Sequence, residues 1–269
     1  MIGYLHIRVY NINGKQCVKL KDDVFSRIDN NSLSLLFNKT TGLQFMEGVS
    51  TQIFSLIKEG KSLNEMLEIL NDKYKDVSEK ILESDLIDFL YELEINDIIE
   101  WDKADYITNY MGVVQEKDYR QLEKYYLEIL NMKLIDKKKT NFLSVKSKNY
   151  FHAASLRTEH MMGNDTYFII SNEKEITTSI SFYGLNAGIK TLMLANITDK
   201  HNSEENIIKL FNYCKDYFKE LGFKKIKFQC VGSNEIPILS LVKKMGMTYE
   251  TTLRKDFNNL DVHVYSLFL

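Results

Sequence analysis

The front of the chain alternates between apolar and polar positions and then changes to a helical period. Short alternating or apolar runs predict three strands, in residues 24–29, 32–37 and 42–46. Apolar residues three or four positions apart then predict three helices, over residues 49–58, from Ser62 and from Ser78. This order, closed by the apolar tail 98–101, is typical of a winged-helix-like module.

A second change of period begins near residue 142. Strand patterns there cover residues 142–147, 166–171, 177–184, 189–198, 224–231 and 261–269. Helical patterns cover residues 201–223 and 236–247, and Asn202 or Ser203 caps the first of them. The mixture predicts an α+β chain whose second domain is mixed α/β.

The length of the chain, 269 residues, suits two small domains. We place the first domain at residues 1–101 and the second at residues 142–269. Residues 102–141 carry a helical pattern over 118–134 and are expected to form a helical connector that partly belongs to the second domain. Apolar residues make up 44% of the chain, which is enough to bury a core.

The charge balance and the cysteines argue against several classes of protein. The formal net charge is −2 and no block of like charges occurs, so neither nucleic acid nor an anionic membrane is an expected partner. No run reaches about 18 apolar residues, so no transmembrane helix is expected. Cys17, Cys214 and Cys230 match neither a disulfide framework nor a CxxC metal pair. We therefore expect a cytoplasmic protein without a metal site.

Residues 42–100 resemble the PqqD family, the leader-peptide recognition elements of pathways that modify ribosomally made peptides. The resemblance rests on a strand, a polar turn, a helix ending at Gly60, a helix with the capping box Ser62–Glu65, and a long acidic amphipathic helix with a hydrophobic close. It implies that the domain binds the leader of a precursor peptide as an added strand, by β-augmentation. A DNA-binding winged helix is the alternative, which the acidic third helix disfavours.

The resemblance places the peptide-binding residues on the third strand and the third helix. They are Gly42, Leu43, Gln44, Phe45 and Met46 on the strand, and Asp85, Asp88, Phe89 and Glu92 on the helix. Three of the four helix residues are acidic, so a leader with basic residues is expected. The alternative is that these carboxylates only form a solvated helix face.

Residues 165–269 resemble the GNAT (Gcn5-related N-acetyltransferase) superfamily. The resemblance rests on the central strand IKTLMLANIT, the helix after it, the strand KIKFQCV, a turn with Asn234, a helix ending in Gly-Met, and a last strand DVHVYSL. It implies an acyl donor, acetyl-CoA or another acyl-CoA, whose pantetheine arm pairs with the backbone of Ala195, Asn196 and Ile197. It also implies that Asn234 contacts the coenzyme arm.

The chain departs from the family where the donor's diphosphate is bound. The family's Gly-rich loop corresponds to residues 202–207, with Asn202 and Ser203 at its start and Glu205 and Ile207 where small residues are expected. Glycines let backbone N–H groups approach a diphosphate at a helix N-terminus, whereas carboxylates repel it. Simple capping of the helix is the alternative. An acyl carrier protein, which presents pantetheine without a free diphosphate, is an alternative donor that agrees with the lost loop.

Catalytic side chains are harder to place. Leu241 stands where the family often has a Tyr that protonates the leaving thiolate, and the central strand 189–198 contains no carboxylate. Tyr183 and His201 remain as candidate catalytic residues, although a lone His is more often structural. Proximity and backbone amides can support acyl transfer with few side chains.

Together these features predict a protein of peptide maturation, in a pathway of the bacteriocin type. The first domain would bind a precursor leader, and the second would acylate an amine or hydroxyl of the same peptide. Tethering raises the local concentration of the peptide to about the millimolar range. Two alternatives stay open: a degenerate second domain in a leader-binding scaffold, and a stand-alone N-acetyltransferase.

Overall fold

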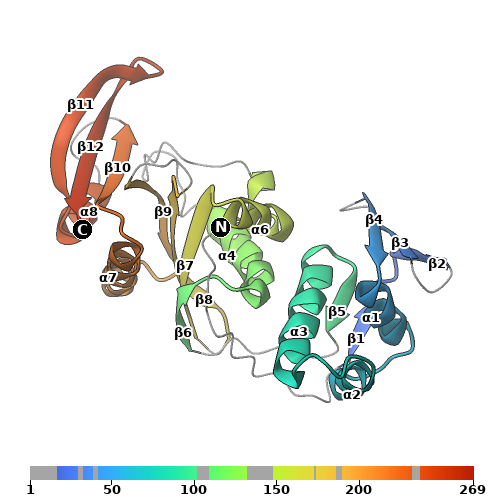
Figure 1. The fold of residues 1–269 in the computed structure, drawn as a ribbon. Helices are drawn as coiled ribbons and strands as arrows, with labels where there is room; N and C mark the ends of the chain where they lie inside the picture. The colour runs from blue at the N-terminus through green and yellow to red at the C-terminus, as the bar shows by residue number, and fades with distance from the viewer. Residues whose placement is uncertain are drawn as a thin grey trace. The chain divides into compact units, whose positions relative to one another are not determined.

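The computed structural model describes residues 17–29, 33–38, 42–101, 109–131, 148–172, 174–185, 190–231 and 237–269. The chain divides into two compact units, Met1–Asp105 and Tyr106–Leu269, each described by itself below (Figure 1). The predicted strand 142–147 and the predicted site residue Asn234 lie outside the described residues.

In its described residues, the first unit combines two small antiparallel sheets with three helices. One sheet has the order β2–β3–β4, formed by Phe25–Asp29, Leu33–Asn38 and Gly42–Glu47. In the other sheet β1 (Val18–Leu20) pairs with β5 (Ile99–Trp101). The helices are α1 (Val49–Lys58), α2 (Leu63–Lys73) and α3 (Glu79–Ile95). The predicted order of three strands and three helices is confirmed, whereas the pairing of β1 with the apolar tail is not visible in the pattern.

Local sequence sets the ends of these helices. Ser62 caps α2, because its Oγ accepts the Glu65 N–H while Glu65 Oε2 accepts the Ser62 N–H at 2.8 Å. The predicted capping box is therefore confirmed. Gly60 follows α1 with a φ of 71°, a left-handed conformation that glycine adopts at little cost. The apolar faces of the helices meet in one core, in which Phe54, Met66 and Leu90 are completely buried.

The second unit is built on a seven-stranded sheet of order β11–β12–β10–β9–β8–β7–β6. Its strands are β6 (Tyr110–Val113), β7 (Asp165–Ser171), β8 (Ile176–Tyr183), β9 (Thr191–Asp199), β10 (Lys225–Val231), β11 (Thr248–Phe257) and β12 (Leu260–Phe268). β9 and β10 are parallel, and the other neighbouring strands are antiparallel. The predicted mixed α/β architecture is confirmed.

Helices pack on both faces of this sheet. Those in the described residues are α4 (Tyr119–Asn131), α6 (Ala153–Met161), α7 (Glu204–Glu220) and α8 (Pro237–Lys244), and short 3-10 turns lie at Glu116–Asp118 and Lys148–Phe151. α7 buries its predicted apolar stripe against β6–β9, where the Phe218 ring lies 4.9 Å from that of Phe182. α4 and α6 pack against β8 and β7. Side chains alternate along a strand, so successive residues face opposite sides of the sheet. The side of the sheet toward α7 is apolar, and the side toward α4 can carry polar groups.

Candidate functional site

The parallel pair β9–β10 comes apart partway along its length. The two strands are paired over four residue pairs, which end at Leu194 and Phe228. β9 continues along β8 as far as Asp199, and β10 continues along β12 as far as Val231. The two halves of the sheet therefore diverge beyond Leu194 and Phe228, and the β9–β10 ladder stops there although both strands go on.

A β-bulge lies at the same point. In the β8–β9 register Ser181 faces Asn196 while Phe182 faces Leu194, so Ala195 is the extra residue. A bulge turns the peptide groups around it out of the regular ladder. The predicted donor-binding residues Ala195, Asn196 and Ile197 are thus the ones at which β9 leaves β10. Their role in binding stays a prediction.

Polar side chains line the face of the sheet toward α4. Asn196 Nδ2 donates to Ser181 Oγ at 3.2 Å, and the Tyr125 hydroxyl of α4 donates to Thr198 Oγ1 at 2.9 Å. Asn196, Ser181 and Thr198 are all buried, and each has a hydrogen-bond partner, as buried polar groups require. The sheet next to the bulge is therefore polar although it is covered.

Tyr183, one of the two predicted catalytic residues, lies on this face at the end of β8, two residues beyond Ser181. Its side chain is half-buried. Burial, and to a smaller extent the charge of Asp165, raises the pKa of its phenol. Tyr183 therefore keeps its proton at neutral pH and can donate a hydrogen bond or a proton.

Asp165 is a buried carboxylate that the sequence pattern does not single out. It is 3% exposed and accepts hydrogen bonds from Tyr150 and, at 3.3 Å, from Tyr167. The two phenols also contact each other at 2.9 Å, and burial raises the pKa of Tyr167. Asp165 faces Tyr183 across the β7–β8 ladder, and its charge adds to the effect of burial on the Tyr183 phenol.

A second buried carboxylate holds the turn between β9 and α7. Asp199 is 5% exposed, and its Oδ1 accepts the N–H groups of His201 at 2.9 Å and Ser203 at 2.7 Å. Its Oδ2 accepts a hydrogen bond from Thr178 Oγ1 at 2.6 Å. The expectation that the central strand carries no carboxylate is wrong, because β9 runs one residue beyond the predicted range 189–198 and ends at Asp199.

The predicted residues His201, Asn202 and Ser203 all lie in this turn. Of the two candidate caps, Ser203 is the N-cap of α7, since its Oγ accepts the Asn206 N–H at 3.2 Å. Asn202 has a φ of 54°, a left-handed conformation that asparagine tolerates better than most residues. The side chain of His201 is exposed. In the β8–β9 ladder Tyr183 faces Met193 and Thr178 faces Asp199, so His201 lies beyond the opposite end of β8 from Tyr183.

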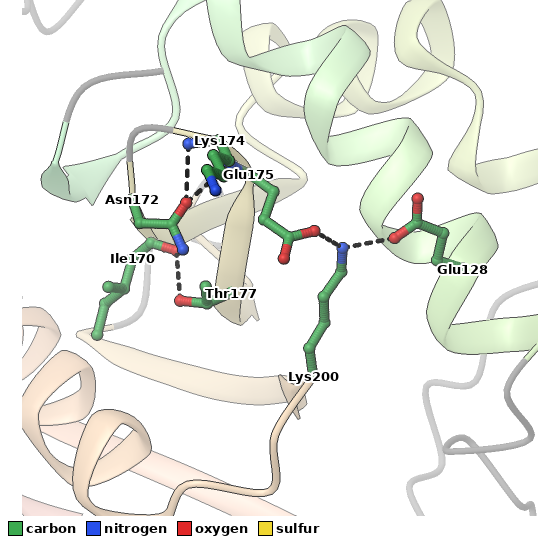
Figure 2. Close-up of polar contacts among 7 residues, drawn as sticks. All are labelled: Glu128, Ile170, Asn172, Lys174, Glu175, Thr177 and Lys200. Atoms are coloured by element: carbon green, nitrogen blue, oxygen red, sulfur yellow. Dashed lines mark hydrogen bonds and ion pairs between the residues drawn. The ribbon is translucent and has the colours of Figure 1, made fainter. Parts of the chain in front are cut away.

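The residue after Asp199 anchors the end of β9. Figure 2 shows the Lys200 ammonium between Glu175 of the β7–β8 hairpin and Glu128 of α4. The Lys200 side chain is 7% exposed, and its Nζ lies 5.8 Å from the centre of the Tyr125 ring. Burial by itself lowers the pKa of this ammonium, but the hydrogen bonds to the two carboxylates outweigh burial and raise it. Lys200 stays charged and joins β9, α4 and the hairpin.

Two of the cysteines, Cys214 and Cys230, lie in the core of the second unit. Cys214 and Cys230 are completely buried, and burial raises the pKa of both thiols, that of Cys230 to about 11. Among the residues that the structure describes, no three His, Cys, Asp or Glu side chains are placed to hold a metal ion. No helix in the described ranges is long and apolar enough to span a membrane.

The predicted peptide-binding residues lie in the first unit. Residues 42–46 belong to β4, an edge strand of the three-stranded sheet, where Phe45 is 63% exposed and Met46 is buried. On α3, Asp85 is exposed, whereas Asp88, Phe89 and Glu92 are half-buried. α1 packs against β3 and β4, and α3 packs against α2 and β5. Phe89 packs against the core of the unit, so part of its role is structural.

No protein-family model and no curated protein matches the sequence, whereas solved structures do. The chain is similar to the ribosomal-protein-S5-alanine acetyltransferase of Vibrio fischeri (13% identity, 59% of this chain and 91% of that chain, TM-score 0.47). It is similar to the acetyltransferase of Salmonella typhimurium that modifies the N-terminal serine of ribosomal protein L7/L12 (14% identity, 56% and 91%, TM-score 0.47). It is also similar to the microcin C7 self-immunity acetyltransferase MccE, solved with acetyl-CoA and AMP (16% identity, 56% and 88%, TM-score 0.45).

Proposed function

We propose that the second unit is a GNAT-type acyltransferase that transfers an acyl group from a pantetheinyl thioester to an amine. The observation that carries this proposal is the early end of the β9–β10 ladder at Leu194 and Phe228, beside the bulge at Ala195. Where two parallel strands diverge, an extended arm with amide groups, such as pantetheine, can pair with the backbone of one of them. The segment to which this pairing is assigned is the predicted one, Ala195 to Ile197.

Tyr183 is the side chain best suited to assist the transfer. The reaction joins the acceptor nitrogen to the acyl carbon and releases a thiol, whose sulfur takes up a proton. Tyr183 holds its proton at neutral pH and lies on the polar face near Ser181 and Asn196. The family's usual position for this acid is occupied by Leu241, which is buried in the core of this unit. The proposal therefore assigns the acid to β8 rather than to α8.

We further propose that the acceptor is a peptide captured by the first unit. β4 is an edge strand, so an extended leader can add to it through main-chain hydrogen bonds, with exposed Phe45 as a side-chain contact. The exposed acid Asp85 favours a leader with basic residues. Capture by the first unit raises the local peptide concentration to about the millimolar range, so the second unit needs little affinity of its own.

A second candidate function, a leader-binding partner protein without catalysis, has support at the turn after β9. Asp199, Glu204 and Glu205 gather at the N-terminus of α7. The Ala195 region agrees with a pantetheine arm, but these acids do not agree with a bound diphosphate. If the second unit binds no thioester at all, the chain acts only as a scaffold.

Donor binding separates the two functions. The full chain is titrated with acetyl-pantetheine and with acetyl-CoA by calorimetry, and its thermal unfolding is followed with each. A donor present at 100 times its dissociation constant adds about 2.7 kcal/mol of stability. If neither compound binds nor shifts unfolding, the acyltransferase is refuted and the scaffold remains.

Peptide capture is tested with a library of random peptides displayed on phage and selected on the full chain. We expect the selected peptides to bind Phe45→Ala about tenfold more weakly, since a buried aromatic anchor contributes a kcal/mol or more. The matched control is Leu260→Ala, which truncates a 51% exposed apolar residue of the second unit. Peptides that bind both variants as tightly as the parent chain would contradict capture at β4.

A further inference from the structure

We propose that Asp199 is an internal substitute for the donor's diphosphate, so that the second unit recognises a pantetheinyl thioester without recognising a nucleoside diphosphate at the turn before α7. The inference about the donor rests on the proposed acyl transfer. The occupation of the turn by Asp199 does not depend on acyl transfer, because it is argued from the hydrogen bonds that Asp199 accepts there.

The backbone N–H groups of the turn are already in use. Asp199 Oδ1 accepts those of His201 and Ser203, at 2.9 and 2.7 Å. The Asn202 N–H donates to the Asp199 carbonyl oxygen at 3.3 Å. A diphosphate at a helix N-terminus is held by N–H groups of this kind, which a buried carboxylate here satisfies instead.

Backbone N–H groups in the first turn of α7 also have acceptors already. Ser203 accepts the N–H groups of Asn206 and Ile207, through its Oγ and its carbonyl oxygen, both at 3.2 Å. In residues 201–207, all of them described, this leaves the N–H groups of Glu204 and Glu205 for an external anion. Both of these residues carry exposed carboxylates, which repel a phosphate at close range. The Glu204 carboxylate also engages the nearby cation, Lys244 of α8, at 2.5 Å.

Asp199 is fixed rather than displaceable. Besides the two N–H groups, it accepts the Thr178 hydroxyl at 2.6 Å from the facing position of β8. A diphosphate that took over the turn would break these bonds and leave a buried carboxylate beside a more highly charged anion. The backbone of Ala195 to Ile197 lies earlier in β9 and does not depend on this turn. The donor can therefore use its pantetheine arm alone, whether that arm is free or attached to a carrier protein.

Inorganic pyrophosphate is the direct probe of the turn. The ¹⁵N-labelled full chain is titrated, and the amide signals of residues 201–207 are followed. We expect no shift in the parent chain. Asp199→Ala frees two N–H groups and should gain pyrophosphate affinity of about tenfold or more, the order expected for hydrogen bonds to a charged group. Asp199→Asn keeps an oxygen acceptor and removes only the charge, so its gain should be clearly smaller.

Each contrary result overturns the role of Asp199. Shifts at residues 201–207 in the parent chain show that the turn is open to a diphosphate, and the absence of any gain in Asp199→Ala shows that Asp199 is not what closes it. If Asp199→Ala does not fold, hydrogen exchange on the parent chain tests whether Asp199 occupies the N–H groups of the turn. The amides of His201 and Ser203 must be protected, and their rapid exchange contradicts the proposal.

The donor is tested on the same three chains with acetyl-pantetheine, acetyl-CoA and an acetylated acyl carrier protein. We expect acetyl-pantetheine and acetyl-CoA to bind the parent chain equally, within about threefold, and Asp199→Ala to prefer acetyl-CoA by about tenfold. Tighter binding of the carrier protein than of acetyl-pantetheine identifies a carrier as the source. A tenfold preference of the parent chain for acetyl-CoA overturns the inference. If no donor binds any chain, the proposed acyl transfer fails, whereas the pyrophosphate titration still decides the role of Asp199.

Discussion

Replacing Lys200 by Met should destabilise the second unit selectively. The substitution keeps most of the apolar stem but removes the ammonium between Glu128 and Glu175 (Figure 2). The Lys200 side chain is 7% exposed, whereas the two carboxylates are 34% and 41% exposed. The lysine is therefore buried, but water can reach its partners once it is gone.

The exposure of the partners sets the expected magnitude. Removing one member of a fully buried ion pair costs about 3–5 kcal/mol, and an exposed pair contributes about 0–1 kcal/mol. Lys200 lies between these limits, and it also loses a cation–π contact with Tyr125 that is worth about 0.5–1 kcal/mol. We expect Lys200→Met to lower the free energy of unfolding of the second unit by about 2 kcal/mol.

The assay uses the position of the chain's single tryptophan. Trp101 lies in β5, so its fluorescence reports the first unit, while circular dichroism and hydrogen exchange in β9 also report the second. In urea the variant should shift the second unit's transition and leave the fluorescence transition in place. The control is Lys244→Met, whose pair with Glu204 is 52% and 53% exposed and should cost less than about 1 kcal/mol. If the two variants are equally stable, or if the fluorescence transition moves as far, the reasoning about Lys200 is refuted.

Three further predictions concern protons. Tyr183→Phe should lower the rate of acyl transfer about 10²-fold, as loss of a general acid does, with unchanged donor affinity; an unchanged rate would remove Tyr183 from the mechanism. Burial lowers the pKa of His160 to about 4, so its contribution to stability is complete above its ordinary pKa and is lost as pH falls toward 4. His160→Gln should therefore lose less stability than the parent between pH 7 and 5, by up to about 2 kcal/mol in paired urea titrations, and equal losses would contradict this. Burial raises the pKa of Asp118 to about 6, so its contribution is present at low pH and lost as pH rises through 6. Asp118→Asn can still accept the Gln115 N–H. This variant should be more stable than the parent by about 2 kcal/mol at pH 7 and as stable as the parent near pH 4. A stability difference that does not change with pH would argue against burial as the cause of the raised pKa.

Elements with a strong period could be predicted from the sequence. The stripe of α7 and the alternation of β10 both appear as buried positions in the structure. The capping box at Ser62 and Glu65 could also be predicted, because its two hydrogen bonds join residues three positions apart. Such features depend on neighbours in the chain, and the residue pattern contains those neighbours.

Elements with a weak period were not predicted. β6 has four residues, Tyr110–Val113, which is too short for alternation to be visible. α6 buries only Ala153 and Leu156, so it has no continuous apolar stripe. Both belong to the second unit, in part within the segment expected to be a connector. Their place is decided by packing on β7 and not by their own sequence.

The same distinction separates the parts of the candidate site. The sequence by itself determined where the central strand and the following helix lie, and so which backbone segment, Ala195 to Ile197, comes before the turn. Only the tertiary structure decided that the acids Asp165 and Asp199 are buried and what they hold. Their partners Tyr150 and Thr178 come from other segments of the chain, and an acid can be buried only where such partners satisfy it. A pattern of neighbours does not contain that information, because it depends on contacts that form only when the sheet is assembled.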